Sequence, residues 1–266
     1  MKILHIALKS IYTPGWSYQE NFLTKYHSKL GHKVSLITNL YSREKDKIIK
    51  NSDVNLFFES FGIDVYRLKE KKNRNHQSLL ATYPDLKETI INIAPDLIFL
   101  HGLQLRDVLK IHNYVRFNSS KLIIDNHADF ENSANNIVSK YLLHRTLWRI
   151  IAKIIEPETQ IFYGVTPDRV DFLRDVYKIP TNKIKLLHQG VDDEIVLKER
   201  YYNDFEDVDF SNAIITGGKL NKKDNELRQL IEVVSEIDSF KLIIFGTLSK
   251  NIRRLISRSQ LQDKII

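Results

Sequence analysis

Apolar segments alternate with helical patterns along almost the whole chain, and this alternation restricts the fold more than any other feature of the sequence. Several of the apolar segments are continuous, as expected for parallel strands that are buried on both faces. The predicted strands before residue 190 are Ile3–Leu8, Val34–Thr38, Asp64–Leu68, Leu97–Leu100, Leu122–Asp125, Phe162–Thr166 and Ile184–Leu187.

The intervals between these strands have the apolar spacing or the end signals of helices. Thr166 followed by Pro167, for example, is an N-cap with proline at the first helical position. The predicted helices are Ser17–Leu30, Leu79–Ile93, Leu105–Tyr114, Phe130–Ile155 and Pro167–Tyr177. A regular succession of strand and helix predicts an α/β fold with a doubly wound parallel sheet.

A second series of strands and helices follows a charged stretch without apolar segments, which is typical of an interdomain linker. Its members are the strand Ala213–Thr216, the helix Glu226–Ile237, the strand Lys241–Phe245, the basic helix Lys250–Arg258 and the start of a strand at Lys264–Ile266. We therefore expect a first Rossmann-like domain at 1–195, a linker at 196–210 and an incomplete second Rossmann-like domain at 211–266. Two strands and a fragment would leave an apolar sheet edge unpaired, so we expect either a C-terminally truncated chain or a partner that covers this edge.

A glycine pair followed by three lysines lies inside this second series. Residues 214–216 complete an apolar strand, and a helix opens after the lysines. Such a turn directs backbone N–H groups and the positive end of a helix at whatever lies above it. The sequence therefore predicts a diphosphate site. Its predicted ligands are Gly217, Gly218, Lys219, Lys222 and Lys223.

Composition excludes several classes of protein. Among the 266 residues there is no cysteine, so disulfides and thiolate chemistry are excluded. No apolar run reaches the roughly 18–20 residues that span a bilayer, and the first apolar stretch is too short for a signal peptide, so we expect a cytoplasmic protein. The formal net charge of +7 permits an acidic partner. Nucleic acid is disfavoured, because no basic stripe with interleaved aromatic residues is found.

Motifs along most of the chain resemble those of the retaining GT-B glycosyltransferases of family 4. They are Lys2–Ile6, Pro14–Asn21, Leu30–Val34, Pro95–Gly102, Leu122–Asp129, Tyr163–Pro167, Lys185–Asp192 and the turn at 217–219. The resemblance implies two Rossmann-like domains that face each other across a cleft. The first would bind the acceptor and the second would bind the nucleotide sugar.

The resemblance also implies roles for individual residues. His127 would hydrogen-bond the transferred sugar or its phosphate, which suits an imidazole near neutral pH, and it is our candidate catalytic residue. The implied acceptor-side or cleft residues are Gly15, Tyr18, Gln19, His101 and Asp129. Other roles stay open for several of them: a turn for Gly15, a backbone-bonded histidine at a strand end for His101, and a cap for Asp129. Asp125 could likewise orient the ring of His127.

The chain departs from the family pattern at the phosphate turn. The family carries an arginine there and, five positions later, a lysine followed by glycine. Lys219 takes the arginine position in this chain, but Asp224 and Asn225 occupy the other two, so Lys222 or Lys223 would have to substitute. Asp224 also suits a helix N-cap. The family's E-x₇-E motif would lie beyond residue 266.

From these motifs we expect a glycosyltransferase of the hexosyltransferase type. It would move a sugar from a nucleotide-diphosphate donor, with retention, to a cell-surface polysaccharide or a glycolipid. We expect no metal and no other cofactor, because lysines and backbone amides would stabilise the leaving diphosphate and no D-x-D motif is found. The alternative is a non-catalytic, truncated GT-B remnant or partner subunit.

The segment 141–155 is amphipathic. Its predicted apolar stripe is Leu143, Leu147, Ile150, Ile151 and Ile154, while Arg145, Arg149 and Lys153 recur every four residues. Two interpretations stay open. The helix could lie on an anionic membrane, close to a lipid-linked acceptor, which would make the protein peripheral at the inner face of the membrane. Alternatively, it packs on the sheet and its cationic side chains are solvated.

Overall fold

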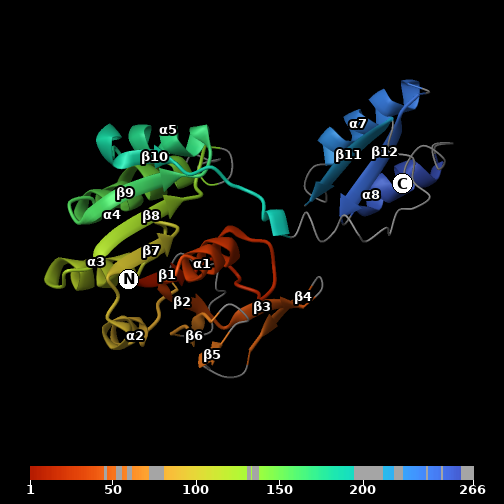
Figure 1. Cartoon of the computed structure of the whole chain (residues 1–266). Helices are drawn as coiled ribbons and strands as arrows, with labels where there is room; N and C mark the ends of the chain where they lie inside the picture. Colours follow the sequence, from red (N-terminus) through yellow and green to blue (C-terminus); the bar gives the residue numbers. More distant parts are fainter. Residues whose placement is uncertain are drawn as a thin grey trace. The chain divides into compact units, whose positions relative to one another are not determined.

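The computed structural model describes residues 1–44, 47–51, 56–58, 62–71, 81–130, 133, 138–194, 212–218, 224–237, 239–246 and 248–258. Contacts within the chain divide it into two units, Met1–Asp192 and Asp193–Ile266, whose elements are labelled in Figure 1. The predicted linker at 196–210 lies outside the described residues.

The first unit is built on an eight-stranded sheet with the order β10-β9-β8-β7-β1-β2-β6-β5. Its strands are β1 (Lys2–Ala7), β2 (Lys33–Asn39), β5 (Leu56–Phe58), β6 (Asp64–Leu68), β7 (Leu97–His101), β8 (Lys121–Asn126), β9 (Thr159–Gly164) and β10 (Ile184–Leu186). All neighbouring strands are parallel except β5 and β6. The predicted α/β fold with a doubly wound parallel sheet is confirmed.

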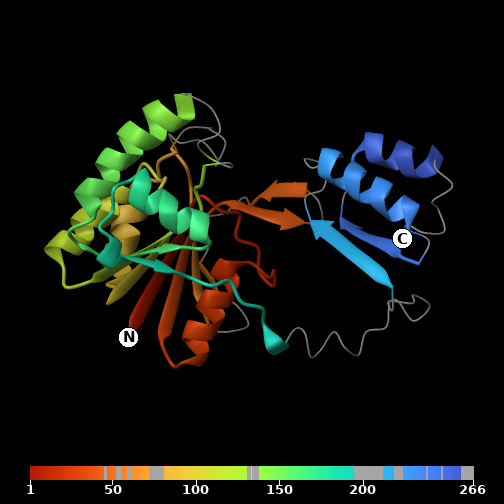
Figure 2. The same ribbon diagram turned by 90° about the horizontal axis from the view of Figure 1, so that it is seen from above.

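Helices cover both faces of this sheet. They are α1 (Gln19–Lys29), α2 (Leu86–Ile93), α3 (Val108–Phe117), the π-helix η1 (Val138–Trp148), α4 (Arg149–Ile155), α5 (Pro167–Asp175) and the 3₁₀ turn η2 (Thr181–Lys183). Figure 2 shows α1 on one side of the sheet and the η1–α4 helix on the other. A short antiparallel hairpin, β3 (Tyr41–Glu44) and β4 (Lys47–Lys50), was not predicted.

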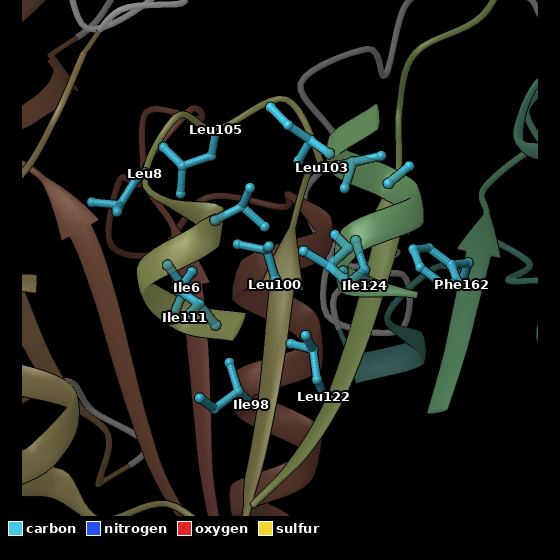
Figure 3. Packing of buried hydrophobic residues seen from close by; sticks show 14 of the residues in the cluster. Ile6, Leu8, Ile98, Leu100, Leu103, Leu105, Ile111, Leu122, Ile124 and Phe162 are labelled. Carbon is cyan, nitrogen blue, oxygen red and sulfur yellow. The ribbon is translucent and has the colours of Figure 1, made fainter. Parts of the chain in front are cut away.

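Alternation along each strand divides the side chains between these two faces. On β1, Leu4 and Ile6 enter the larger apolar cluster, together with residues of α2, α3, α4 and α5. Figure 3 shows Ile6 near Leu100 of β7 and Ile111 of α3 in this cluster. His5, between the two apolar residues, is fully buried and points to the other face, where α1 packs against β1 and β2. The strand that anchors the core therefore also delivers a histidine to α1.

Several predicted helices begin later than expected, by the largest margins after Leu79 and Phe130. The helix predicted from Leu79 begins at Leu86, with Asp85 as its N-cap, and the helix predicted from Leu105 begins at Val108. Pro84 explains the first shift, because the residue before a proline is disfavoured in the helical region and proline itself is best tolerated in the first turn.

The predicted apolar stripe on the 141–155 helix is wrong in part: Ile151 is buried and Leu143 packs against the core, but the other members do not face it. The residues that the helix buries are His144, Trp148, Ile151, Ala152 and Ile155. Three members of the predicted stripe are exposed instead: Leu147 by 45%, Ile150 by 58% and Ile154 by 45%. The buried residues keep the spacing of an α-helical face and are offset by one residue from most of the predicted stripe. The physical reason is tertiary: the offset face buries the large side chain of Trp148 and places His144 Nδ1 2.8 Å from the hydroxyl oxygen of Tyr177.

The second unit contains a parallel pair of strands, β11 (Ala213–Gly218) and β12 (Lys241–Gly246), with the helices α7 (Asp224–Glu236) and α8 (Lys250–Arg258). Its core consists of Leu227, Ile231, Val234, Leu242 and Ile252. The apolar spacing of α7 and the continuous apolar stretch of β12 agree with the predicted strand–helix–strand–helix series.

The corrected helix face predicts a clear difference between two neighbouring residues. Trp148→Ala should lower the free energy of unfolding by about 3–5 kcal/mol, because removal of a buried tryptophan leaves a cavity. Leu147→Ala is the matched control and should change the free energy of unfolding by less than about 0.5 kcal/mol, as is usual for exposed positions. Urea denaturation followed by circular dichroism measures both. A larger loss in Leu147→Ala would contradict the observed face.

Candidate functional site

The candidate site lies where β7 and β8 end, next to the start of α1. Parallel strands present their carboxyl ends at one edge of the sheet, and ligands of open α/β sheets bind beyond that edge. His101 is the last residue of β7, and His127 follows β8 directly. The two predicted site histidines thus lie at the same edge, on neighbouring strands.

The buried carboxylate of Asp125 joins the polar groups of this edge. Its Oδ2 lies 2.9 Å from His101 Nδ1 and accepts from Gln19 Nε2 at 3.2 Å, while Oδ1 accepts from the backbone N–H of Gly102 at 2.9 Å. His127 Nε2 lies 3.3 Å from Oδ1. Burial alone would raise the pKa of Asp125, but the charges and hydrogen bonds of His101 and His127 hold it well below its usual range. Asp125 is therefore an anion that accepts hydrogen bonds and donates none.

The candidate catalytic residue, His127, is held by this anion and still reaches solvent, with 43% of its side chain exposed. Burial opposes its charged form, but the hydrogen bond and the charge of Asp125 outweigh burial and raise the pKa of His127. Arg169 lowers this pKa and Glu20 raises it, both by smaller amounts. Because Asp125 accepts at Nε2, His127 is a proton donor over a wider pH range than a free imidazole.

Two further histidines extend the site behind His101. His5 Nδ1 lies 2.9 Å from His101 Nε2, and His5 Nε2 lies 2.9 Å from His27 Nδ1 of α1. We call His27, His5, His101 and Asp125 the histidine row. Neither His5 nor His27 was among the predicted site residues. The signal that could have found His5 is its position between Leu4 and Ile6 on a strand, which puts it on the face opposite to the core.

Asp129 forms an ion pair with a cation of α5. Its Oδ2 accepts from Arg169 Nε at 3.2 Å, and Arg169 lies in the first turn of that helix. Sequence analysis missed Arg169 as well. Because the charge of Arg169 also acts on the pKa of His127, the pair lies near the imidazole. Asp129 therefore holds a cation of α5 near His127.

The loop before α1 supplies the remaining predicted cleft residues. Gly15 has a φ of 75°, in the left-handed region that disfavours other residues, and this explains the glycine without a ligand. Tyr18 is the N-cap residue of α1 and stacks with Trp16 at 5.6 Å between ring centroids. Of these residues, only Gln19 is brought to Asp125. Its amide oxygen is buried and has no hydrogen-bond donor within the described part of the chain.

A cavity of about 210 Å³ lies beside Gln19, between α1 and the segment 187–192. Its lining mixes apolar side chains such as Phe22 and Leu187 with the polar Ser17 and Gln19. Asp192 ties the segment to α1 through a buried ion pair with Lys25 and a hydrogen bond from the hydroxyl of Tyr26 at 2.9 Å. Asp192 therefore holds one end of the segment that lines the cavity against α1.

In the second unit, Gly217 and Gly218 are the last two residues of β11, so the strand runs further than predicted and the glycines are not themselves the turn. A Cβ on Gly217 would lie 3.1 Å from the carbonyl oxygen of Phe245. This close approach accounts for the glycine. The other predicted diphosphate ligands, Lys219, Lys222 and Lys223, lie outside the described residues.

Two absences hold for the described residues. No group of three or more His, Asp, Glu or Cys side chains among them could hold a metal ion. No helix within the described ranges is long and apolar enough to cross a membrane.

Solved structures with the same fold cover both units of the chain. Sucrose-phosphate synthase from Thermosynechococcus elongatus matches with a TM-score of 0.65 and 14% identity, over 100% of this chain and 69% of that one. WaaG, a glycosyltransferase involved in lipopolysaccharide biosynthesis, matches with a TM-score of 0.59 and 12% identity, over 99% and 69%. HepE from Anabaena, in complex with UDP and glucose, matches with a TM-score of 0.57 and 13% identity, over 100% and 68%. These similarities show the GT-B fold.

No curated protein matches the sequence. The profile of Glycosyltransferase Family 4 matches residues 22–195, which is more than half of the chain and includes β7, β8 and His127. The chain therefore belongs to Glycosyltransferase Family 4.

Proposed function

We propose that the chain is a retaining glycosyltransferase that moves a sugar from a nucleotide-diphosphate donor to a saccharide or lipid-linked acceptor. The observation that carries the proposal is His127, held as a donor by the buried anion Asp125 at the ligand-binding edge of a family 4 sheet. Two structural neighbours support the donor class: HepE was solved with UDP and glucose, and the UDP-GlcNAc 2-epimerase from Neisseria meningitidis, with a TM-score of 0.52, was solved with UDP-GlcNAc.

In the proposed reaction, the bond between the sugar and the diphosphate breaks while the acceptor hydroxyl bonds to the same carbon from the same face. The acceptor proton leaves with a diphosphate oxygen. The N–H of His127 would donate to the transferred sugar or its phosphate, and the buried amide oxygen of Gln19 would accept from a sugar hydroxyl. The lysines at 219, 222 and 223 would stabilise charge on the departing diphosphate without a metal.

His127→Gln should lower kcat by about 10²–10³-fold, the usual loss for one donor to developing charge. The matched control is His112→Gln, because His112 also bonds a carboxylate, Glu158 at 2.8 Å, but lies on α3 away from the site. Release of nucleoside diphosphate from UDP-, GDP- and ADP-sugars measures both. Equal rates in wild type and His127→Gln would contradict the role.

The raised pKa of His127 predicts how kcat depends on pH, which the same assay measures. The protonated form of His127 is the active donor and its pKa is raised, so kcat should be full below that pKa and should be lost as the pH rises through it. His127→Gln should lack this alkaline limb.

Lys219→Ala and Lys223→Ala should weaken binding of the cognate nucleoside diphosphate about 10–100-fold, because a hydrogen bond to a charged group contributes about 1.5–3 kcal/mol. Lys241→Ala is the matched control, since Lys241 opens β12 at the end away from Gly218. Calorimetric titration with UDP, GDP and ADP measures the affinities. If wild type binds none of the three, the alternative is favoured: a non-catalytic remnant or partner subunit.

A lipid-linked acceptor is supported by the exposed side of the 141–155 helix. It carries the apolar residues Leu142, Leu147, Ile150 and Ile154, together with Arg145 and Lys153. Apolar side chains flanked by cations suit an anionic bilayer surface. We therefore include peripheral association with such a surface in the proposed function.

Replacing both Leu147 and Ile150 by serine should reduce binding to phosphatidylglycerol-containing vesicles at least about tenfold, because each buried apolar side chain contributes about 1.5–3 kcal/mol. Ile91→Ser is the matched control, since Ile91 is an exposed apolar residue on α2. Vesicle sedimentation, with pure phosphatidylcholine for comparison, measures the binding. Wild type that stays in the supernatant with both vesicle types would contradict membrane association.

A further inference from the structure

The histidine row crosses the middle of the sheet from a helix to the site. Its members lie on four successive elements: His27 on α1, His5 on β1, His101 on β7 and Asp125 on β8. The hydrogen-bonding side-chain atoms of each consecutive pair are 2.9 Å apart. His5 and Asp125 are fully buried, and His101 is 6% exposed. The rings of His5 and Phe99 stack at 5.3 Å between centroids, so aromatic packing holds the row in place.

The chemistry of the row allows one arrangement of hydrogens when its rings are neutral. Each hydrogen bond needs one proton, and the anion Asp125 can only accept, so His101 donates from Nδ1. His101 Nε2 then accepts from the Nδ1–H of His5, and His5 Nε2 accepts from the Nδ1–H of His27. All three imidazoles must therefore be in the Nδ1–H tautomer, and all three donors point towards Asp125.

The surroundings favour the neutral form of His5 and of His27. Burial, and then the neighbouring His101 and His27, lower the pKa of His5 well below its ordinary value, although Asp125 opposes this. Burial, followed by His32 and His101, lowers the pKa of His27. At the other end of the row the pKa shift has the opposite sign, because the hydrogen bond and the charge of Asp125 raise the pKa of His127. Near neutral pH the rings of His5 and His27 are therefore uncharged.

We propose that His5 and His27 are positioning residues for the site: they hold His101 in the Nδ1–H tautomer, and this keeps Asp125 anionic and aimed at His127 and Gln19. The row acts through hydrogen bonds and touches no substrate. The expected effect on kcat rests on the proposed function. The tautomers of the three histidines and the pKa of His127 can be tested without it.

His5→Phe separates positioning from packing. A phenyl ring can keep the stack on Phe99 but cannot donate to His101 or accept from His27. If the row only filled space, His127 would titrate as in wild type. Positioning predicts that the pKa of His127 falls by about one unit, a tenfold lower proton affinity, because Asp125 is no longer fixed against it. His5→Asn, which restores an N–H donor towards His101, should recover part of this shift.

Nitrogen-15 NMR of histidine-labelled full-length protein tests the proposal. In wild type, His5, His27 and His101 should each carry the proton on Nδ1, and the control His112→Gln should leave these signals and the His127 titration unchanged. Nε2–H tautomers at His5 and His27, or an unshifted His127 in folded His5→Phe, would overturn it. If His5→Phe does not fold, the wild-type tautomers and the pKa of His127 in His27→Ala test the proposal instead. Nδ1–H tautomers and a lowered pKa would support it, and their absence would overturn it.

Transferase activity is measured in addition to the NMR experiments. In His5→Phe, kcat should fall about tenfold at neutral pH with KM unchanged, following the protonated fraction of His127. If the NMR results are as expected but no nucleotide sugar is turned over by wild type, the proposed function fails and the positioning role stands. If wild type turns over donor but the tautomers differ, the positioning role alone fails.

Discussion

The interaction on which the site depends is the burial of a charged carboxylate, Asp125, inside a parallel sheet. A buried charge is costly unless several donors compensate it. In this sheet the donors come from three separate parts of the chain: the end of β7, the first residue of α1 and the residue after β8. The carboxylate therefore links segments that are distant in sequence. Because its oxygens must accept hydrogen bonds, it also orients the imidazole of His127.

The same sheet explains why the fold and the site can share strands without conflict. One face of β1, β7 and β8 supplies Leu4, Ile98 and Leu122 to the large apolar cluster. The other face, together with the strand ends, supplies the histidine row. A period of two along each strand is enough to give a single strand both roles, so the core and the polar network are built from interleaved positions.

The elements most strongly marked in the sequence were predicted well. Continuous apolar segments located the parallel strands, because strands buried on both faces need such segments. His127, His101 and Gln19 were proposed through their resemblance to family motifs, and the structure places all three next to Asp125. A contact of Asp125 with His127 was an expectation, but its contacts with His101 and Gln19 were not, because these partners are up to 106 residues away and spacing along the chain does not reveal them.

Other features could not be derived from local patterns. The 141–155 helix buries the face that carries Trp148 and His144, and His144 bonds Tyr177, a partner 33 residues away that the apolar spacing of the helix does not reveal. His5 and His27 gain their importance only when β1 pairs with β7 and α1 packs on β1. Gly217 and Gly218 lie within β11 and not in a turn after it, and only the pairing with β12 shows how far β11 continues.

The position of His5 between Leu4 and Ile6 has a consequence for how β1 tolerates change. Moving the register of this strand by one residue would turn the imidazole into the apolar core and direct two aliphatic side chains at α1. A single inserted or deleted residue in β1 would thus damage stability and the polar network at once. We therefore expect β1 to tolerate exchanges of side chains better than any change in its length.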